Sequence, residues 1–202
     1  MQLKEKKPVL HRILEHPFAY SLNQMLNPWT VAAYRDFVRD KVRRGPETRV
    51  LDVGCGVGAN WDVLMPCRYT GIDINPAYIS EAERRHGRAF FTMDASALTF
   101  ADSSFDTAVS VATCHHLSDQ TIRAMVSDMK RVLAPGGLFH VIDPVLPARP
   151  NAHFKRWLFE HDRGRNQRTR RQMLELFGPL GRIVDQDVVE GPMHDVLYLA
   201  LA

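Results

Sequence analysis

Five short apolar segments in the middle of the chain constrain its fold more than any other feature. They are rich in β-branched and aromatic residues and are bounded by Gly, Pro or Asp, which is typical of buried strands. They are residues 49–53, 69–74, 88–93, 105–111 and 138–143. Helical patterns lie between several of them. Such strand–helix alternation predicts an α/β fold in which helices cover both faces of a parallel sheet.

The expected helices carry their own start and stop signals. In residues 118–133 apolar side chains recur at helical spacing, Ser118 is placed to cap the start, and the sequence APGG follows the end. Asn-Pro pairs begin two further helices, and a glycine closes each. These are Asn27-Pro28 with Gly45, and Asn75-Pro76 with Gly87.

The C-terminal residues 181–202 show a different pattern. Two β-rich stretches flank Gly191-Pro192 with almost no helix between them. So short a connection predicts an antiparallel hairpin. The sheet is therefore expected to end in an antiparallel strand.

The segment VLDVGCGVGAN, residues 50–60, joins the first strand to glycines at every second position. Glycine lets backbone approach a ligand closely, and ligands of open α/β sheets bind at the carboxyl ends of the strands. Asp73 ends the next strand, where a carboxylate can accept hydrogen bonds from ribose hydroxyls. Asp94 follows the third strand. Dinucleotide enzymes use similar features, but the G-x-G-x-G spacing and the room for only one mononucleotide-binding half favour a ligand without a pyrophosphate.

Five pieces of the sequence resemble the class I S-adenosylmethionine-dependent methyltransferases. They are VLDVGCGVGAN, GIDIN, FTMDAS, FDTAVSVATCHHLSD and MKRVLAPGGLFHVID, in the family's order over residues 48–145. The resemblance implies a Rossmann-like, seven-stranded sheet of order 3-2-1-4-5-7-6 with strand 7 antiparallel. It also implies S-adenosyl-L-methionine as cofactor and S-adenosyl-L-homocysteine as product. The C-terminal hairpin expected from the sequence would supply the last two strands.

The same resemblance implies roles for matching positions. The glycines would pack against the amino acid and ribose of the cofactor, and Asp52 would orient the loop or the cofactor ammonium. Asp73 would hold the ribose hydroxyls, Ile74 would lie on the adenine, and Asp94 would accept from its amino group. The full set of expected cofactor-binding residues is Asp52, Gly54, Cys55, Gly56, Gly58, Asp73, Ile74, Asp94, Ala95, Val111 and Ala112.

The sequence CHHLSD, residues 114–119, holds the candidates for catalysis. Methyl transfer to oxygen or nitrogen releases a proton, and histidine is a suitable general base, which makes His115 and His116 candidates. Alternatively, a histidine here packs the pocket wall. No metal is expected, because adjacent residues rarely face one ion together. Asp143, after the fifth strand, either contacts the acceptor or belongs to a turn.

We expect one methyltransferase domain with four parts. Residues 1–44 form an N-terminal helical cap, 45–143 the cofactor-binding core, 144–178 an insert on the acceptor side, and 179–202 the hairpin. Eight basic residues lie between positions 149 and 171 of the insert. They suit an anionic acceptor, although a solvated helix face or an Arg–Asp network explains them equally well. The expected acceptor-side residues are His116, Asp143, Trp157, Arg163 and Arg165.

Composition and charge narrow the choice of partners. The formal net charge is only +3. The fourth strand is not followed by an N-P-P-Y-like tetrad, which in the methyltransferase family marks methylation of a base or amide nitrogen. Nucleic acid is therefore not expected as a partner. The N-terminal segment is amphipathic and could cover the site or touch a membrane surface. No apolar run approaches the ~20 residues of a membrane span. An odd number of cysteines, three, points to the reducing cytoplasm.

These observations predict an enzyme that transfers a methyl group by in-line displacement to an oxygen or nitrogen atom of a small-molecule or lipid acceptor. One alternative is a protein that binds S-adenosylmethionine without catalysing transfer and serves as a partner or regulator. A nicotinamide oxidoreductase is a third and weaker candidate.

Overall fold

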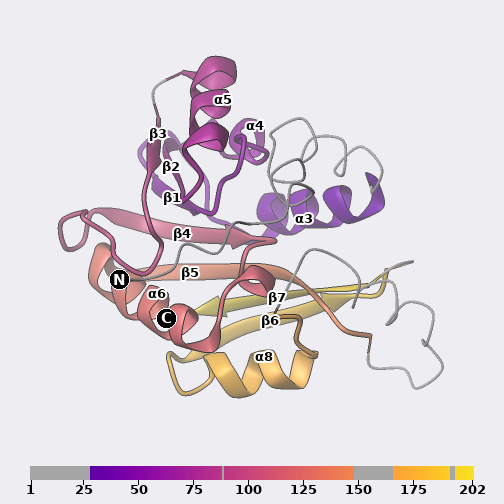
Figure 1. Cartoon of the computed structure of the whole chain (residues 1–202). Coiled ribbons are helices and arrows are strands. Elements are labelled where there is room, and N and C mark those ends of the chain that lie inside the picture. The colour runs from indigo at the N-terminus through magenta and orange to yellow at the C-terminus, as the bar shows by residue number, and fades with distance from the viewer. Residues whose placement is uncertain (1–27, 88, 148–165, 192–193) are drawn as a thin grey trace, which may run out of the picture.

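Seven strands form one sheet in the computed structural model, which describes residues 28–87, 89–147, 166–191 and 194–202 (Figure 1). Their order is β3-β2-β1-β4-β5-β7-β6, which confirms the predicted topology. The strands are β1 (Arg49–Val53), β2 (Arg68–Asp73), β3 (Phe90–Thr92), β4 (Phe105–Val111), β5 (Leu133–Val145), β6 (Ile183–Val189) and β7 (Asp195–Leu201). Strands β1 to β5 pair in parallel, whereas β7 pairs antiparallel with both β5 and β6.

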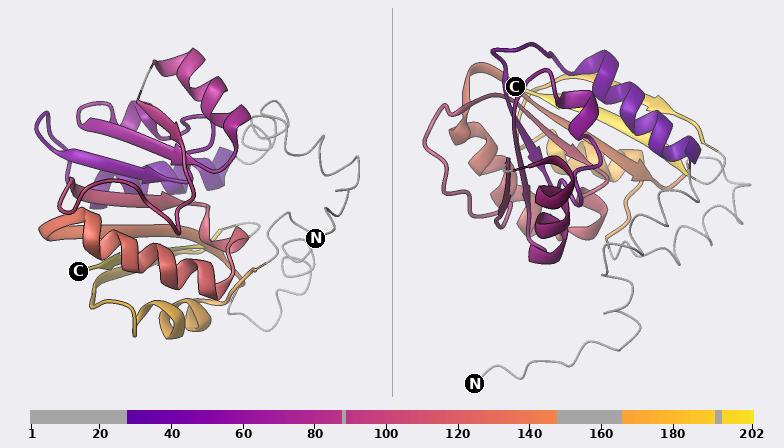
Figure 2. Two further views of the ribbon diagram at one scale, coloured as in Figure 1. Left: turned by 60° about the vertical axis from the view of Figure 1, so that its left-hand side comes forward. Right: turned by 90° about the horizontal axis from the view of Figure 1, so that it is seen from above.

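Helices cover both faces of the sheet, each over its own apolar core (Figures 1 and 2). On one face lie α3 (Pro28–Lys41), α4 (Trp61–Leu64) and α5 (Pro76–His86). On the other lie α6 (Asp119–Val132) and α8 (Arg170–Phe177). The amphipathic pattern of α6 buries Ile122, Met125 and Met129 completely, or nearly so, against the sheet. No helix in the described ranges is long and apolar enough to cross a bilayer.

The predicted caps of α5 and of the start of α6 are present, whereas α3 ends at Lys41 and so is not closed by Gly45 as expected. The Ser118 side chain accepts a hydrogen bond from the Thr121 amide at the start of α6. At the start of α5, Asn75 accepts from the Ala77 amide and Pro76 occupies the first turn. Gly87 ends that helix with a positive φ of 101°. The starts and stops of these helices therefore follow from local sequence.

Two elements differ from expectation. Strand β5 begins at Leu133 rather than at residue 138, because Leu133 already pairs with Phe105, and an irregularity follows before Thr107 pairs with Leu138. Helix α8 was not expected from apolar periodicity. The start of α8 carries a capping box in which Thr169 and Gln172 bond each other's backbone amides, and this Thr-x-x-Gln spacing was the available signal.

Parallel pairing places the last residues of β1 to β5 at one edge of the sheet, called here the carboxyl edge. Because β7 runs antiparallel to β5, the β6–β7 connection also lies at this edge, where Val145 pairs with Asp195. Residues 1–27 and 148–165 lie outside the described ranges, and so do Trp157, Arg163 and Arg165. The proposed division into four parts stays a prediction.

Candidate functional site

The glycine loop leaves β1 at the carboxyl edge and is fastened to β2. Amides of Gly54 and Cys55 donate to the carbonyl oxygen of Ile72 at 2.8 and 2.9 Å. Gly54, Gly56 and Gly58 all have positive φ values, of 73°, 55° and 83°. A Cβ added to Gly54 would come within 2.3 Å of the Thr113 hydroxyl oxygen. Position 54 therefore requires glycine, because the backbone has a positive φ and Thr113 leaves no room for a side chain.

Asp73 ends β2 directly beside this loop. One carboxylate oxygen accepts from the Gly56 amide at 3.0 Å and the other accepts from the Asn75 amide at 2.8 Å. Burial raises the pKa of the carboxyl group, and the two amide bonds oppose that rise. A carboxylate has about four acceptor positions, so two amide bonds leave capacity for hydroxyl donors. The neighbouring Ile74 is 69% exposed and offers an apolar surface at the same place.

Asp52 lies inside the sheet on the face covered by α3, α4 and α5. Its Oδ2 accepts from the Tyr69 hydroxyl at 2.9 Å, and Oδ1 has no hydrogen-bond partner within the described residues. Burial raises the pKa of Asp52 to about 6. Such a carboxylate beneath the loop favours a positive or donating group nearby. Cys55 is also buried, and burial raises the pKa of its thiol, so this cysteine packs the loop rather than reacts.

Asp94 and Ala95 follow β3 at the far side of the site. The Asp94 Oδ1 accepts from both the amide and the hydroxyl of Ser96, at 2.8 and 2.7 Å, and thereby closes a short turn. Asp94 is exposed, and Ala95 is partly buried. Thus β2 and β3 each present a carboxylate at the carboxyl edge.

The end of β4 is strained. Ala112 has a φ of 51°, which is unusual for a residue with a Cβ, and its amide donates to the Ile142 carbonyl at 2.8 Å. Val111, the preceding residue, is buried. The strained residue directs the chain into residues 113–117, called here the histidine turn. It contains the 3-10 helix Cys114–His116.

Asp143, near the end of β5, supports this turn from below. Only 1% exposed, its carboxylate accepts from the amides of Thr113, Cys114 and His115 at 3.0, 2.7 and 3.1 Å. The His115 Nδ1 lies 2.9 Å from the Asp143 Oδ1. Since an ionised carboxylate only accepts, Nδ1 carries a proton, and in the neutral imidazole the lone pair is then on Nε2.

The two histidines differ in exposure. His115 is 7% exposed, whereas His116 is exposed, and their ring centroids are 4.0 Å apart. The sequence pointed to both residues and to Asp143, but it did not indicate that Asp143 holds His115. That pairing joins segments 28 residues apart, which no local pattern records.

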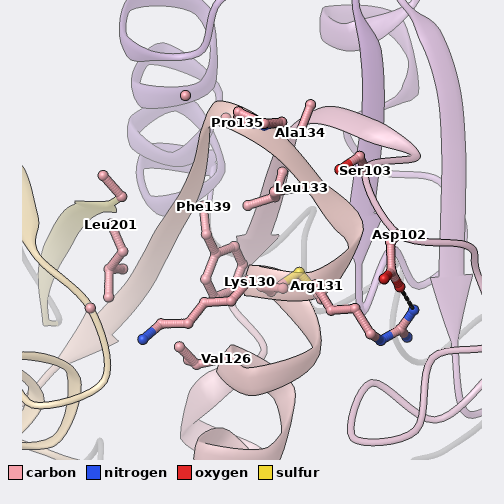
Figure 3. A pocket seen from close by; sticks show the side chains of 15 residues that line it. Asp102, Ser103, Val126, Lys130, Arg131, Leu133, Ala134, Pro135, Phe139 and Leu201 are labelled. Carbon is pink, nitrogen blue, oxygen red and sulfur yellow. Dashed lines mark hydrogen bonds and ion pairs between the residues drawn. The ribbon is translucent and has the colours of Figure 1, made fainter.

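A pocket of about 470 Å³ lies elsewhere in the molecule, near the start of β5 and the end of β7 (Figure 3). It is lined by residues of α6, of the β5 start and of the C-terminus, with the Arg131–Asp102 ion pair at one side. None of the candidate site residues lines it. The carboxyl edge, and not this pocket, brings together the loop, Asp73 and His115.

Comparison with known proteins agrees with this geometry. A family model described as a methyltransferase domain matches residues 50–137. A phthiotriol/phenolphthiotriol dimycocerosates methyltransferase of Mycobacterium tuberculosis is 36% identical over 116 residues, covering 54% of this chain and 41% of that protein. A fatty-acid O-methyltransferase of Mycolicibacterium smegmatis is 33% identical over 139 residues, covering 65% and 48%. The chain thus matches less than half the length of these curated relatives.

Solved structures share the fold. A SAM-dependent methyltransferase of Methanosarcina mazei superposes with a TM-score of 0.66 at 22% identity, over 82% of this chain and 96% of that one. A geranyl diphosphate C-methyltransferase of Streptomyces coelicolor superposes with a TM-score of 0.68 at 14% identity, over 84% and 78%. The sheet order agrees with these solved structures, and residues 50–137 are similar to the methyltransferase domain that the family model describes.

Proposed function

We propose that this chain transfers a methyl group from S-adenosylmethionine to an oxygen or nitrogen atom of a small-molecule or lipid acceptor. The observation that carries the proposal is the meeting of the glycine loop, Asp73 and the His115–Asp143 pair at one edge of the sheet. The cofactor supplies an activated methyl group on a sulfonium. The protein then contributes mainly position and desolvation.

The residues at the carboxyl edge fit an adenosine-bearing cofactor. Asp73 has acceptor capacity for ribose hydroxyls, and the exposed side chain of Ile74 can cover one face of a purine. Both hydrogen bonds from Ser96 go to Oδ1 of Asp94, so Oδ2 takes no part in closing the turn. The orphaned Oδ1 of Asp52 places negative charge beneath the loop, which favours the cofactor ammonium. Cys55, Ala95, Val111 and Ala112 would shape the walls.

His115 is the proposed general base. Asp143 holds Nδ1–H, so the Nε2 lone pair is available to take a proton from an acceptor hydroxyl or amine. The acceptor oxygen or nitrogen forms a bond to the methyl carbon as the carbon–sulfur bond breaks, and the proton passes to Nε2. Asp143 stabilises the resulting imidazolium. His116 would face the acceptor from the exposed side of the turn.

The relatives favour a lipid acceptor. Their names give a dimycocerosate lipid and a fatty acid as the molecules that they methylate. The five basic residues at positions 149–165 support an acceptor that carries negative charge, such as a carboxylate, whereas Arg168 is paired with Asp119 and Arg171 with Glu175. We therefore place a fatty acid first among acceptors, with transfer to a carboxylate oxygen. A carboxylate arrives without its proton and only accepts hydrogen bonds, so His115 would orient it in the imidazolium form, with Nε2–H donating to the carboxylate.

The test combines binding and transfer. Calorimetric titration of the full chain with S-adenosylhomocysteine is expected to show one site. Incubation with deuteriomethyl S-adenosylmethionine and an acceptor panel of palmitic acid, a phenolic lipid and a hydroquinone is then followed by mass spectrometry. Label on one of these acceptors supports the proposal.

The variant His115→Gln distinguishes a role of His115 as general base from a role in orienting the acceptor. For a hydroxyl acceptor it is expected to lower kcat by about 10²-fold or more, with S-adenosylhomocysteine affinity unchanged. For palmitic acid, loss of the orienting contact is expected to raise KM more than it lowers kcat. Tight cofactor binding without label on any acceptor would favour the non-catalytic partner instead.

A further inference from the structure

Two residues outside the cofactor site hold the outer side of the histidine turn. Four successive carbonyl groups, those of residues 114–117, each accept a hydrogen bond from Asn166 or Arg168. The Asn166 amide donates to the His115 oxygen at 3.0 Å, and its Nδ2 donates to the His116 oxygen at 3.3 Å. Arg168 donates to the oxygens of Cys114 and Leu117 at 3.0 and 2.8 Å.

Arg168 has every donor engaged. Besides the two carbonyls of the turn, it donates to the Asn166 oxygen at 2.9 Å and to Asp119 Oδ1 at 3.0 and 2.6 Å. Its guanidinium is therefore a fork with five hydrogen bonds, and the residue is 8% exposed. Asp119 begins α6 and balances the charge. Such a planar fork cannot be copied by a lysine, whose ammonium is a point charge.

Asn166 and Arg168, called here the clamp, also join the turn to the end of β5. The Leu146 amide donates to the Arg168 oxygen at 2.9 Å, and Leu146 forms a parallel bridge with Thr169. Asp143, on the same strand, holds the amides of the turn. The histidine turn thus has its amides fixed from one side and its carbonyls fixed from the other.

We propose that Asn166 and Arg168 are positioning residues that fix His115 in the tautomer and place needed for methyl transfer. The inference rests on the proposed function of His115. Buried apolar residues of α6 and α8 carry the packing of this face, among them Met125, Met173 and Phe177. Loosening the clamp therefore disturbs the turn more than the fold. A displacement of the turn by about 1 Å can cost a large factor in rate.

Arg131 provides a matched control at the opposite end of α6. It too makes five hydrogen bonds, to the carbonyls of Leu98 and Phe100 and to the carboxylates of Asp102 and Asp128. It lies beside the pocket of Figure 3, away from the carboxyl edge. Arg131→Lys removes an equivalent fork without touching the histidine turn.

The experiment compares Arg168→Lys, Asn166→Ala and Arg131→Lys in the full chain. Two-bond proton–nitrogen NMR spectra of ¹⁵N-histidine-labelled protein report the His115 tautomer, with His115→Gln used to assign the signals. Wild type is expected to show one tautomer with the proton on Nδ1. Arg168→Lys and Asn166→Ala should move the His115 nitrogens toward values averaged over both tautomers. Arg131→Lys should lower only the melting temperature.

Kinetics supply the second readout, with the acceptor that the labelling assay identifies. Arg168→Lys is expected to lower kcat at least tenfold, while the KM for S-adenosylmethionine and the Kd for S-adenosylhomocysteine stay within twofold. A folded Arg168→Lys protein with the wild-type His115 spectrum would overturn the proposal. If Arg168→Lys does not fold, Asn166→Ala decides by the same spectrum. If the wild type transfers no methyl group while the spectra respond as expected, the proposed function is wrong, but Asn166 and Arg168 are still shown to fix His115.

Discussion

At the scale of single residues, Asp73 makes the sharpest prediction. Asp73→Ala removes the proposed acceptor for ribose hydroxyls and also the hydrogen bond from the Gly56 amide. Loss of a charged partner for buried hydroxyls is expected to weaken S-adenosylhomocysteine binding by about 1–3 kcal/mol. Isothermal titration calorimetry measures the difference.

Asp106→Ala is the matched control for this change. Asp106 also accepts from a backbone amide, that of Arg49 at 2.8 Å, but it lies at the start of β4 and so at the opposite edge of the sheet. Its replacement should cost stability and leave the affinity for S-adenosylhomocysteine unchanged. Equal affinity of wild type and Asp73→Ala would remove Asp73 from the cofactor site.

At the scale of elements, a buried histidine of β5 lies against β7 and takes no part in the proposed reaction. His140 on β5 is 2% exposed, and its Nδ1 lies 3.0 Å from the Tyr198 hydroxyl on β7. Asp185 of β6 and Lys41 of α3 face the same cluster, and Lys41 bonds Asp185 at 3.1 Å. Burial lowers the pKa of His140 to about 4. Protonation of this side chain therefore opposes folding.

The sign of the resulting pH dependence follows from the two states. The unfolded chain takes up a proton on this histidine near its ordinary pKa of about 6.5, before the folded chain does. The contribution of His140 is thus fully present above that pH and is lost as the pH falls toward 4, by up to about 3 kcal/mol. Urea unfolding at pH 7.5 and 5.0 should show a smaller acid loss for His140→Gln than for wild type. Equal losses would show that His140 is not a source of the acid sensitivity.

The elements also show what the sequence can predict. Strands β1 and β4 and the caps at Ser118 and Asn75 follow from patterns within a few residues, so they were predicted closely. The sheet order came from the family resemblance and the short connection of the hairpin. Pairings between distant segments leave no local pattern. The Asp143–His115 bond and the Arg168 fork across about 50 residues therefore needed the structure.

At the scale of the whole molecule, cofactor binding should be linked to global stability. A ligand that binds only the folded chain stabilises it by about 2.7 kcal/mol at a concentration of 100 times its Kd. For a chain of 202 residues this corresponds to a rise in melting temperature of about 5–10 °C. Differential scanning fluorimetry with S-adenosylhomocysteine measures the rise.

The comparison with NAD uses the same measurement to separate two classes of protein. Both ligands carry an adenosine, but the G-x-G-x-G spacing of the loop differs from the G-x-G-x-x-G spacing of dinucleotide-binding sites. S-adenosylhomocysteine should raise the melting temperature, and NAD at the same concentration should not. Asp73→Ala should reduce the rise at a fixed ligand concentration, since its Kd is higher. A rise with NAD alone would instead favour the oxidoreductase, because stabilisation by mass action depends only on which ligand the folded chain binds.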